Sequence, residues 1–180
     1  MTTVFQGWEN FYFMIGSSGA SLIGLLFVVV TLTSGGDAAR LSRGQRLFMT
    51  PTALAFALVL AVSAVALAPG LPRAASAALI SAMAAGSFIN GVRVSIDLKQ
   101  ARSGGDVPHW SDFYMYGLAP VAIDACLVAA AIAAGADLPG SAHCVAALLM
   151  AHLMVALRNA WDLVTWIAPR RPGATGGPPS

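Results

Sequence analysis

Five long apolar stretches, separated by short polar segments, dominate the pattern along the chain. Each stretch exceeds the roughly 20 residues that an α-helix needs to cross a hydrocarbon layer of about 30 Å. Turns are expected at 69–72 and 135–140, because proline lacks an amide donor and glycine ends helices readily. The pattern predicts helices over residues 11–33, 47–68, 74–96, 112–134 and 142–167.

The composition indicates a membrane protein and excludes an ordinary soluble domain. Of the 180 residues, 57% are apolar and 10% are charged, whereas a soluble domain is about 45–50% apolar and about 25% charged. A chain this short could not bury so much apolar surface in one globule. We therefore expect an all-α integral membrane bundle of five transmembrane helices over residues 1–168, followed by a disordered, Pro- and Gly-rich tail at 169–180.

Basic residues indicate the orientation of this bundle. With five helices, the first and third connecting segments and the tail share one side, and the opposite side carries only Arg73. Cytoplasmic segments of membrane proteins are enriched in Lys and Arg, so we expect the N-terminus outside and the C-terminus in the cytoplasm, in a bacterial inner membrane. The basic residues on the shared side are Arg40, Arg43, Arg46, Lys99, Arg102, Arg170 and Arg171.

Aromatic residues gather near the ends of the predicted helices. Trp8 and Tyr12 open the first helix, and Trp110 and Tyr116 open the fourth. Such residues are expected in belts at the level of the lipid headgroups, because their rings have one polar edge.

Small residues recur at helical spacing and predict close contacts between helices. Gly16, Ala20 and Gly24 are spaced by four residues, and Gly117 shares a helix face with Asp124, seven positions further on. In lipid, such stripes let helix backbones approach each other closely. The spacing is compatible with packing within one chain and with packing between copies.

Ionisable residues inside the predicted helices are the strongest candidates for a functional site. A charged side chain at the bilayer centre costs about 2.5–3.5 kcal/mol on insertion scales. Asp124 lies roughly 15–18 Å into the fourth helix and Arg158 roughly 13 Å into the fifth, at 1.5 Å per residue, which makes them the first candidate pair. Four polar residues of the fifth helix fall within an arc of about 120°. Among them, Asp162 lies one turn from Arg158 and could pair with it instead. The predicted cluster, open towards the cytoplasm, comprises Asn90, Arg93, Asp124, His152, Arg158, Asn159 and Asp162.

Three interpretations of this cluster remain open. It could be a salt-bridge network that sets helix register, a path or binding site for an ion, a proton or a small polar solute, or an interface to a partner helix. The second interpretation, a path or binding site, favours a channel- or transporter-like protein. The alternative is a non-transporting accessory or regulatory subunit of a larger membrane complex. Expected partners are the lipid bilayer, further copies of the chain or another membrane protein.

Enzymatic chemistry finds little support in the sequence. His143 and His152 are nine residues apart, on opposite faces of one helix, and no Cys/His cluster is present, so we expect no metal site, no cofactor, no catalytic residues and no enzymatic activity. Cys126 and Cys144 form no CxxC pair and are expected to be small buried residues. The net charge of +2 is too small to indicate nucleic-acid binding.

The first helix carries a family resemblance. Its aromatic start, its Gly/Ala stripe and the run Gly24-Leu25-Leu26-Phe27-Val28 resemble the opening of a group of small, mostly uncharacterised bacterial multi-pass membrane proteins. Some members of that group are labelled modulators of a membrane-anchored AAA protease. The resemblance covers about 20 residues and implies a regulatory role.

The topology is testable with reporter fusions. Fusions after Arg43 and after Arg171 should both report a cytoplasmic location, and a fusion at the 69–72 turn should report an external one. Opposite locations for Arg43 and Arg171 would contradict the five-helix arrangement.

Overall fold

The computed structural model describes residues 4–33, 49–103 and 113–167 and is helical throughout these ranges, apart from turns. Within them, five helices are long and apolar enough to cross a membrane, as the sequence pattern predicts. The predicted tail at 169–180 lies outside the described residues. The elements are α1 (Glu9–Thr33), α3 (Thr50–Leu67), α4 (Arg73–Ser103), the π-helical segment η2 (Phe113–Leu118), α6 (Ala119–Gly135) and α7 (Ser141–Ile167).

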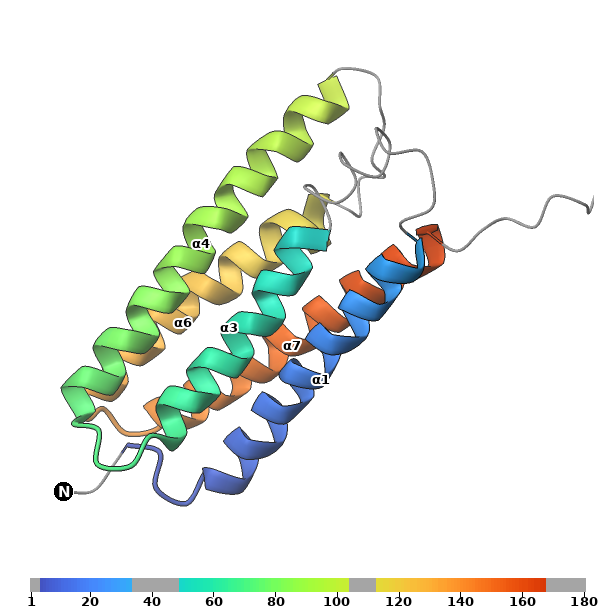
Figure 1. Ribbon diagram of the computed structural model, residues 1–180. Helices are drawn as coiled ribbons and strands as arrows, with labels where there is room; N and C mark the ends of the chain where they lie inside the picture. The colour runs from blue at the N-terminus through green and yellow to red at the C-terminus, as the bar shows by residue number, and fades with distance from the viewer. Residues whose placement is uncertain (1–3, 34–48, 104–112, 168–180) are drawn as a thin grey trace, which may run out of the picture.

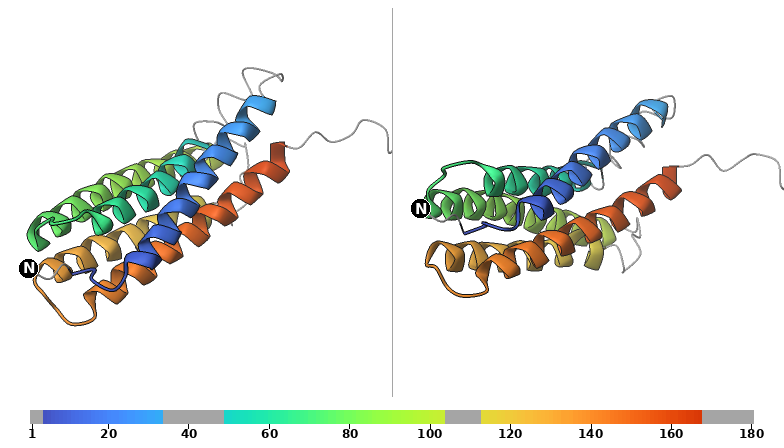
Figure 2. Two further views of the ribbon diagram at one scale, coloured as in Figure 1. Left: turned by 60° about the horizontal axis from the view of Figure 1, so that its bottom comes forward. Right: turned by 90° about the horizontal axis from the view of Figure 1, so that it is seen from below.

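The five long helices run alternately up and down (Figure 1). Helix α4 packs most extensively against α6, and α1 packs most extensively against α3. Helices α3 and α7 also contact each other, so that α3, α4, α6 and α7 surround a common interior, with α1 lying against α3 and α7 (Figure 2). Short connections between antiparallel neighbours are the usual topology of such bundles.

Large side chains from every long helix fill the main core. They include Tyr12 of α1, Phe56 of α3, Ile80 of α4, Leu127 of α6 and Leu149 of α7, each fully buried. On each helix, the buried residues of this core recur every three or four positions, so one face of each helix is directed inward.

Helix α4 is longer than the apolar pattern predicts. The prediction ended this helix at residue 96 and assigned a loop from Asp97, whereas the helix continues to Ser103. Its 31 residues span about 46 Å, more than a hydrocarbon layer of about 30 Å. Leu98 explains the extension, because it is buried in a small cluster with Val94 and Tyr116 that continues the inward face of the helix.

The two predicted turns lie together at the end of the bundle where α1 begins. Gly70 and Gly140 adopt positive φ angles of 70° and 80°, a conformation that glycine adopts without steric cost. The guanidinium of Arg73, at the start of α4, lies 2.7 Å from Oδ2 of Asp137 in the turn between α6 and α7. This ion pair joins the two turns.

Glycines set the closest helix contacts, although not at every position of the predicted stripe. A Cβ on Gly16 would lie 2.8 Å from Cβ of Ser63, and one on Gly117 would lie 2.7 Å from Oγ of Ser95. Ala20 and Gly24, in contrast, are exposed. The inward face of α1 follows Tyr12, Ile15, Gly16, Gly19 and Leu26, because spacings of three and four alternate on a 3.6-residue helix.

Two residues assigned to the aromatic belts are instead buried. Tyr12 is fully buried and contacts the ring of Phe5 at a centroid distance of 5.2 Å. Tyr116 is only 5% exposed.

The predicted burial of Cys126 and Cys144 is also wrong, since both are exposed, on faces that point away from the bundle interior.

Gly16 and Gly24 provide a matched test of the packing. Gly16→Ala should lower the stability of the bundle by about 1–3 kcal/mol, because Ser63 must move to admit the methyl group. Gly24→Ala meets nothing within 4 Å and should be neutral or slightly stabilising. Thermal unfolding in detergent measures both changes. Equal losses in the two variants would contradict this packing of α1 on α3.

Candidate functional site

Asp124 is a carboxylate in the middle of the bundle. It lies midway along the Phe113–Gly135 stretch and is 0% exposed. It shares the inward face of α6 with Leu127 and Ala131, which are also fully buried. A buried charge without compensation is strongly unfavourable, so its neighbours determine what this residue can do.

The nearest ionisable neighbour of Asp124 is His152 of α7. Nδ1 of His152 lies 3.3 Å from Oδ1 of Asp124, and the histidine is 2% exposed. Within the described part of the chain, the contact between the two side chains does not have the geometry of a formed hydrogen bond. The hydroxyl of Ser87, on α4, lies within hydrogen-bonding reach of the Asp124 carboxyl group. The pair is therefore in contact, and Ser87 is a further partner of the carboxyl group.

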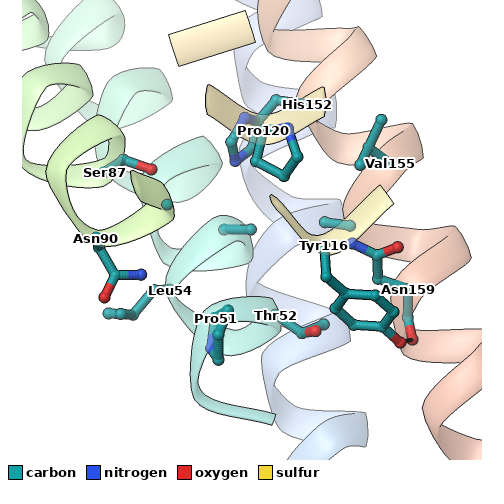
Figure 3. Close-up of a pocket in the computed structure, with 13 residues that line it drawn as sticks. Pro51, Thr52, Leu54, Ser87, Asn90, Tyr116, Pro120, His152, Val155 and Asn159 are labelled. Carbon is teal, nitrogen blue, oxygen red and sulfur yellow. Dashed lines mark hydrogen bonds between the residues drawn. The ribbon is translucent and has the colours of Figure 1, made fainter. Parts of the chain in front are cut away.

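A cavity of about 30 Å³ lies beside this pair. One water molecule requires roughly 10–15 Å³ of such space, so the cavity has room for about two. Four helical segments contribute to its wall: α3, α4, α7 and the η2–α6 stretch (Figure 3). The polar side chains of the wall are Thr52, Ser87, Asn90, Tyr116, His152 and Asn159.

Asn159 and Tyr116 form one end of the cavity through a pair of hydrogen bonds. The Asn159 Nδ2 donates to the Met115 carbonyl at 2.9 Å, and the Tyr116 hydroxyl donates to the Asn159 carbonyl at 2.6 Å. In Figure 3 the Tyr116 ring extends from its own helix to the Asn159 backbone. These bonds join η2 to α7.

The local sequence explains why Met115 needs an outside donor. In a π-helix, each carbonyl accepts from the amide five residues later. For Met115 that position is Pro120, which has no amide hydrogen. The side chain of Asn159 supplies the missing donor, so the irregular backbone of η2 and the amide of α7 are complementary.

The structure brings together part of the predicted cluster. Asn90, His152 and Asn159 line the cavity, and Asp124 contacts His152. Sequence reasoning missed Thr52, Ser87 and Tyr116. The clearest available signal was Pro120, since a proline inside an apolar stretch indicates a backbone carbonyl that needs another partner.

Three charged members of the predicted cluster lie elsewhere. Arg93 is exposed on α4, and Arg158 pairs with Asp162 at 3.3 Å, with the two side chains 43% and 39% exposed. The predicted pairing of Asp124 with Arg158 is therefore wrong. The arc of about 120° was too wide to define one environment: His152 and Asn159 occupy its inward edge, and Arg158 and Asp162 occupy its outward edge.

Metal chemistry has no obvious support in the described residues, where no group of three or more His, Cys, Asp or Glu side chains comes together. His143 is exposed at the other end of α7 and packs edge-on against Trp8, with ring centroids 4.9 Å apart. What the Asp124–His152 pair can do chemically is to exchange a proton and to hydrogen-bond with water or a small solute in the cavity.

Comparisons with known proteins identify no relative of this chain. No family model, no curated protein and no solved structure matches the chain.

The contact between Asn159 and Met115 can be tested by substitution. Asn159→Leu keeps a similar volume but leaves the Met115 carbonyl buried without its donor, which should cost about 1–3 kcal/mol of stability. The control is Arg158→Gln, the adjacent residue, whose exposed ion pair contributes only about 0.3–0.5 kcal/mol. Unfolding in detergent measures both, and a smaller loss for Asn159→Leu than for Arg158→Gln would contradict the assigned role.

Proposed function

We propose that this protein is a small multi-pass protein of the bacterial inner membrane, of channel or transporter type, whose intramembrane polar cluster handles an ion, a proton or a small polar solute. The observation that carries the proposal is the buried Asp124–His152 pair beside a cavity of water size. Ionisable residues within transmembrane helices commonly mark ion or solute pathways.

The hydrogen bonding of the cluster favours transport over a purely structural network. Buried polar atoms in native proteins nearly always have hydrogen-bond partners. A network that served only to set helix register would gain stability by filling its hydrogen bonds. Here the contact between Asp124 and His152 does not have the geometry of a formed hydrogen bond, and neither ring nitrogen of His152 has such a partner among the described residues. His152 lines the cavity, so a solute or water there would supply a partner for its ring.

The cavity also lies towards the end that we propose faces the cytoplasm. The last turns of α1, α4 and α7 and the first turns of α3 and η2 lie at one end of the bundle (Figure 1). The three basic segments of the sequence adjoin these helix ends, which supports a cytoplasmic location and an external N-terminus. Thr52, close to the start of α3, belongs to the cavity wall.

A second candidate is a non-transporting accessory or regulatory subunit. Its support is that small residues also lie on the outer faces of the bundle: Ala20 and Gly24 on α1, and Ala82 and Gly86 on α4, are exposed. Faces of this kind allow close approach of another transmembrane helix. The partner would be a second copy of the chain or another membrane protein.

Flux measurements on proteoliposomes test the first proposal. Purified protein should raise the flux of at least one member of a panel of protons, monovalent ions and small uncharged polar solutes above that of protein-free vesicles. Asp124→Asn should reduce this flux by about tenfold or more, because it replaces the fully buried, ionisable carboxyl group with an amide that cannot ionise. Asp97→Asn, an exposed carboxylate on α4, is the matched control and should retain the flux.

Background flux for every solute, in wild type and variants alike, would overturn the transport proposal. Crosslinking in native membranes would then decide on the second candidate. A stoichiometric membrane partner should be recovered, and recovery of the chain alone would contradict it.

A further inference from the structure

We infer that the species handled at this site is the proton, which Asp124 and His152 exchange and which water in the adjacent cavity carries. The inference rests on the proposed function. It narrows the transported species from an ion, a proton or a small polar solute to the proton. It is carried by the size of the cavity, by the make-up of its wall and by the contact between the two ionisable side chains.

The size of the cavity excludes most solutes. At about 30 Å³ it holds about two water molecules and has no room for a sugar, an amino acid or another organic molecule. Its wall includes the rigid rings of Pro51, Pro120 and Tyr116. Tyr116 is moreover held in place by its hydrogen bond to the Asn159 carbonyl.

The wall suits water better than a metal cation. It offers hydroxyl and amide groups that both donate and accept, from Thr52, Ser87 and Asn90. Mg²⁺ and Ca²⁺ require six or more oxygen ligands, usually including several carboxylates. Among the described residues no carboxylate lines the cavity; Asp124 lies behind His152, against its ring. The donor set therefore fits a hydrogen-bonded water chain.

The buried pair has the geometry for proton exchange. Oδ1 of Asp124 and Nδ1 of His152 lie 3.3 Å apart, slightly longer than a formed hydrogen bond. A small approach of the two side chains would make the bond. Both residues lie near the middle of their helices, so a proton held here is far from either end of the bundle.

The exchange proceeds in two steps. In the first, the Oδ1–H bond of protonated Asp124 breaks and an Nδ1–H bond forms on His152, leaving a carboxylate and an imidazolium. In the second, the imidazolium releases the proton on Nε2, the other ring nitrogen, to a water molecule of the cavity, which becomes hydronium. His152 is then neutral with its hydrogen on Nδ1, and Asp124 is a carboxylate. In the reverse direction a hydronium of the cavity protonates Nε2, the Nδ1–H bond breaks and an Oδ1–H bond forms on Asp124, which restores the starting form.

Few other titratable groups face this space. Tyr116 lines the cavity, but its hydroxyl hydrogen is donated to the Asn159 carbonyl. From α4 the facing side chains are Ser87 and Asn90, and from α3 the facing polar side chain is Thr52. The charged side chains nearest in sequence, Arg93 and Arg158, are exposed on the outer faces of their helices. The titration at the site is thus that of Asp124 and His152.

The first experiment measures proton entry into liposomes that contain a trapped pH-sensitive dye, driven by a potassium gradient with valinomycin. Asp124→Asn and His152→Ala should each lower the proton flux by about 100-fold, the size of a lost proton-transfer group. Asp97→Asn should leave it unchanged. External imidazole should restore part of the flux in His152→Ala, which a purely structural role of the histidine would not allow. Loss of flux in Asp97→Asn, or no loss in Asp124→Asn, would overturn the inference.

The second measurement detects the proton directly. Infrared difference spectra of the purified protein between acid and neutral pH should contain, above the frequency of the exposed carboxyl groups, a protonated carboxyl band of a buried group that shifts in D₂O, disappears in Asp124→Asn and persists in Asp97→Asn. Its presence in Asp124→Asn would overturn the assignment.

Parallel fluxes separate this inference from the proposed function. Flux of sodium, potassium or an uncharged solute that depends on Asp124, with no proton flux, would overturn the inference and leave the proposed function standing. Absence of every flux would overturn both.

Discussion

The arrangement of the bundle depends on one constraint: polar side chains in the middle of long apolar helices have no water beside them and must face one another. Asp124 faces His152 and Ser87, and His152 meets this constraint only in part, because its contact with Asp124 is not a hydrogen bond of good geometry. The helices around them must therefore leave space for water or a solute, and the cavity beside His152 is that space. The chemistry of the site follows from this incomplete pairing.

The irregular start of the fourth helix is the second element of the site. Pro120 leaves a carbonyl at Met115 without its amide donor, and Asn159 of α7 supplies one. Segments of π-helix are often found at functional sites, and here the segment brings Tyr116 into the interior. The same contacts hold α7 against η2, so the wall of the cavity and the packing of two helices depend on a single side-chain amide.

The two ends of the bundle differ in how they are packed. At the end where α1 begins, Phe5, Tyr12 and other apolar residues close the interior, and an ion pair joins the two turns. Towards the other end, hydroxyl and amide groups line part of the cavity wall, and two small apolar clusters, one around Leu163 and one around Leu98, pack the helices beyond it.

Much of the fold could be predicted from the sequence, because the length and apolar character of each stretch depend only on local composition. The all-helical class, the five membrane-length helices, the turns at 69–72 and 135–140 and the deep position of Asp124 were all predictable in this way. The partner of Asp124 was not, because it depends on how far α7 is rotated about its axis and shifted along it. A third of a turn separates His152, which meets the carboxylate, from Arg158, which points outward. That rotation is determined by contacts between distant segments. Examples are the hydrogen bonds from the Asn159 side chain to the Met115 carbonyl and from the Tyr116 hydroxyl to the Asn159 carbonyl. Only the tertiary structure decides the rotation.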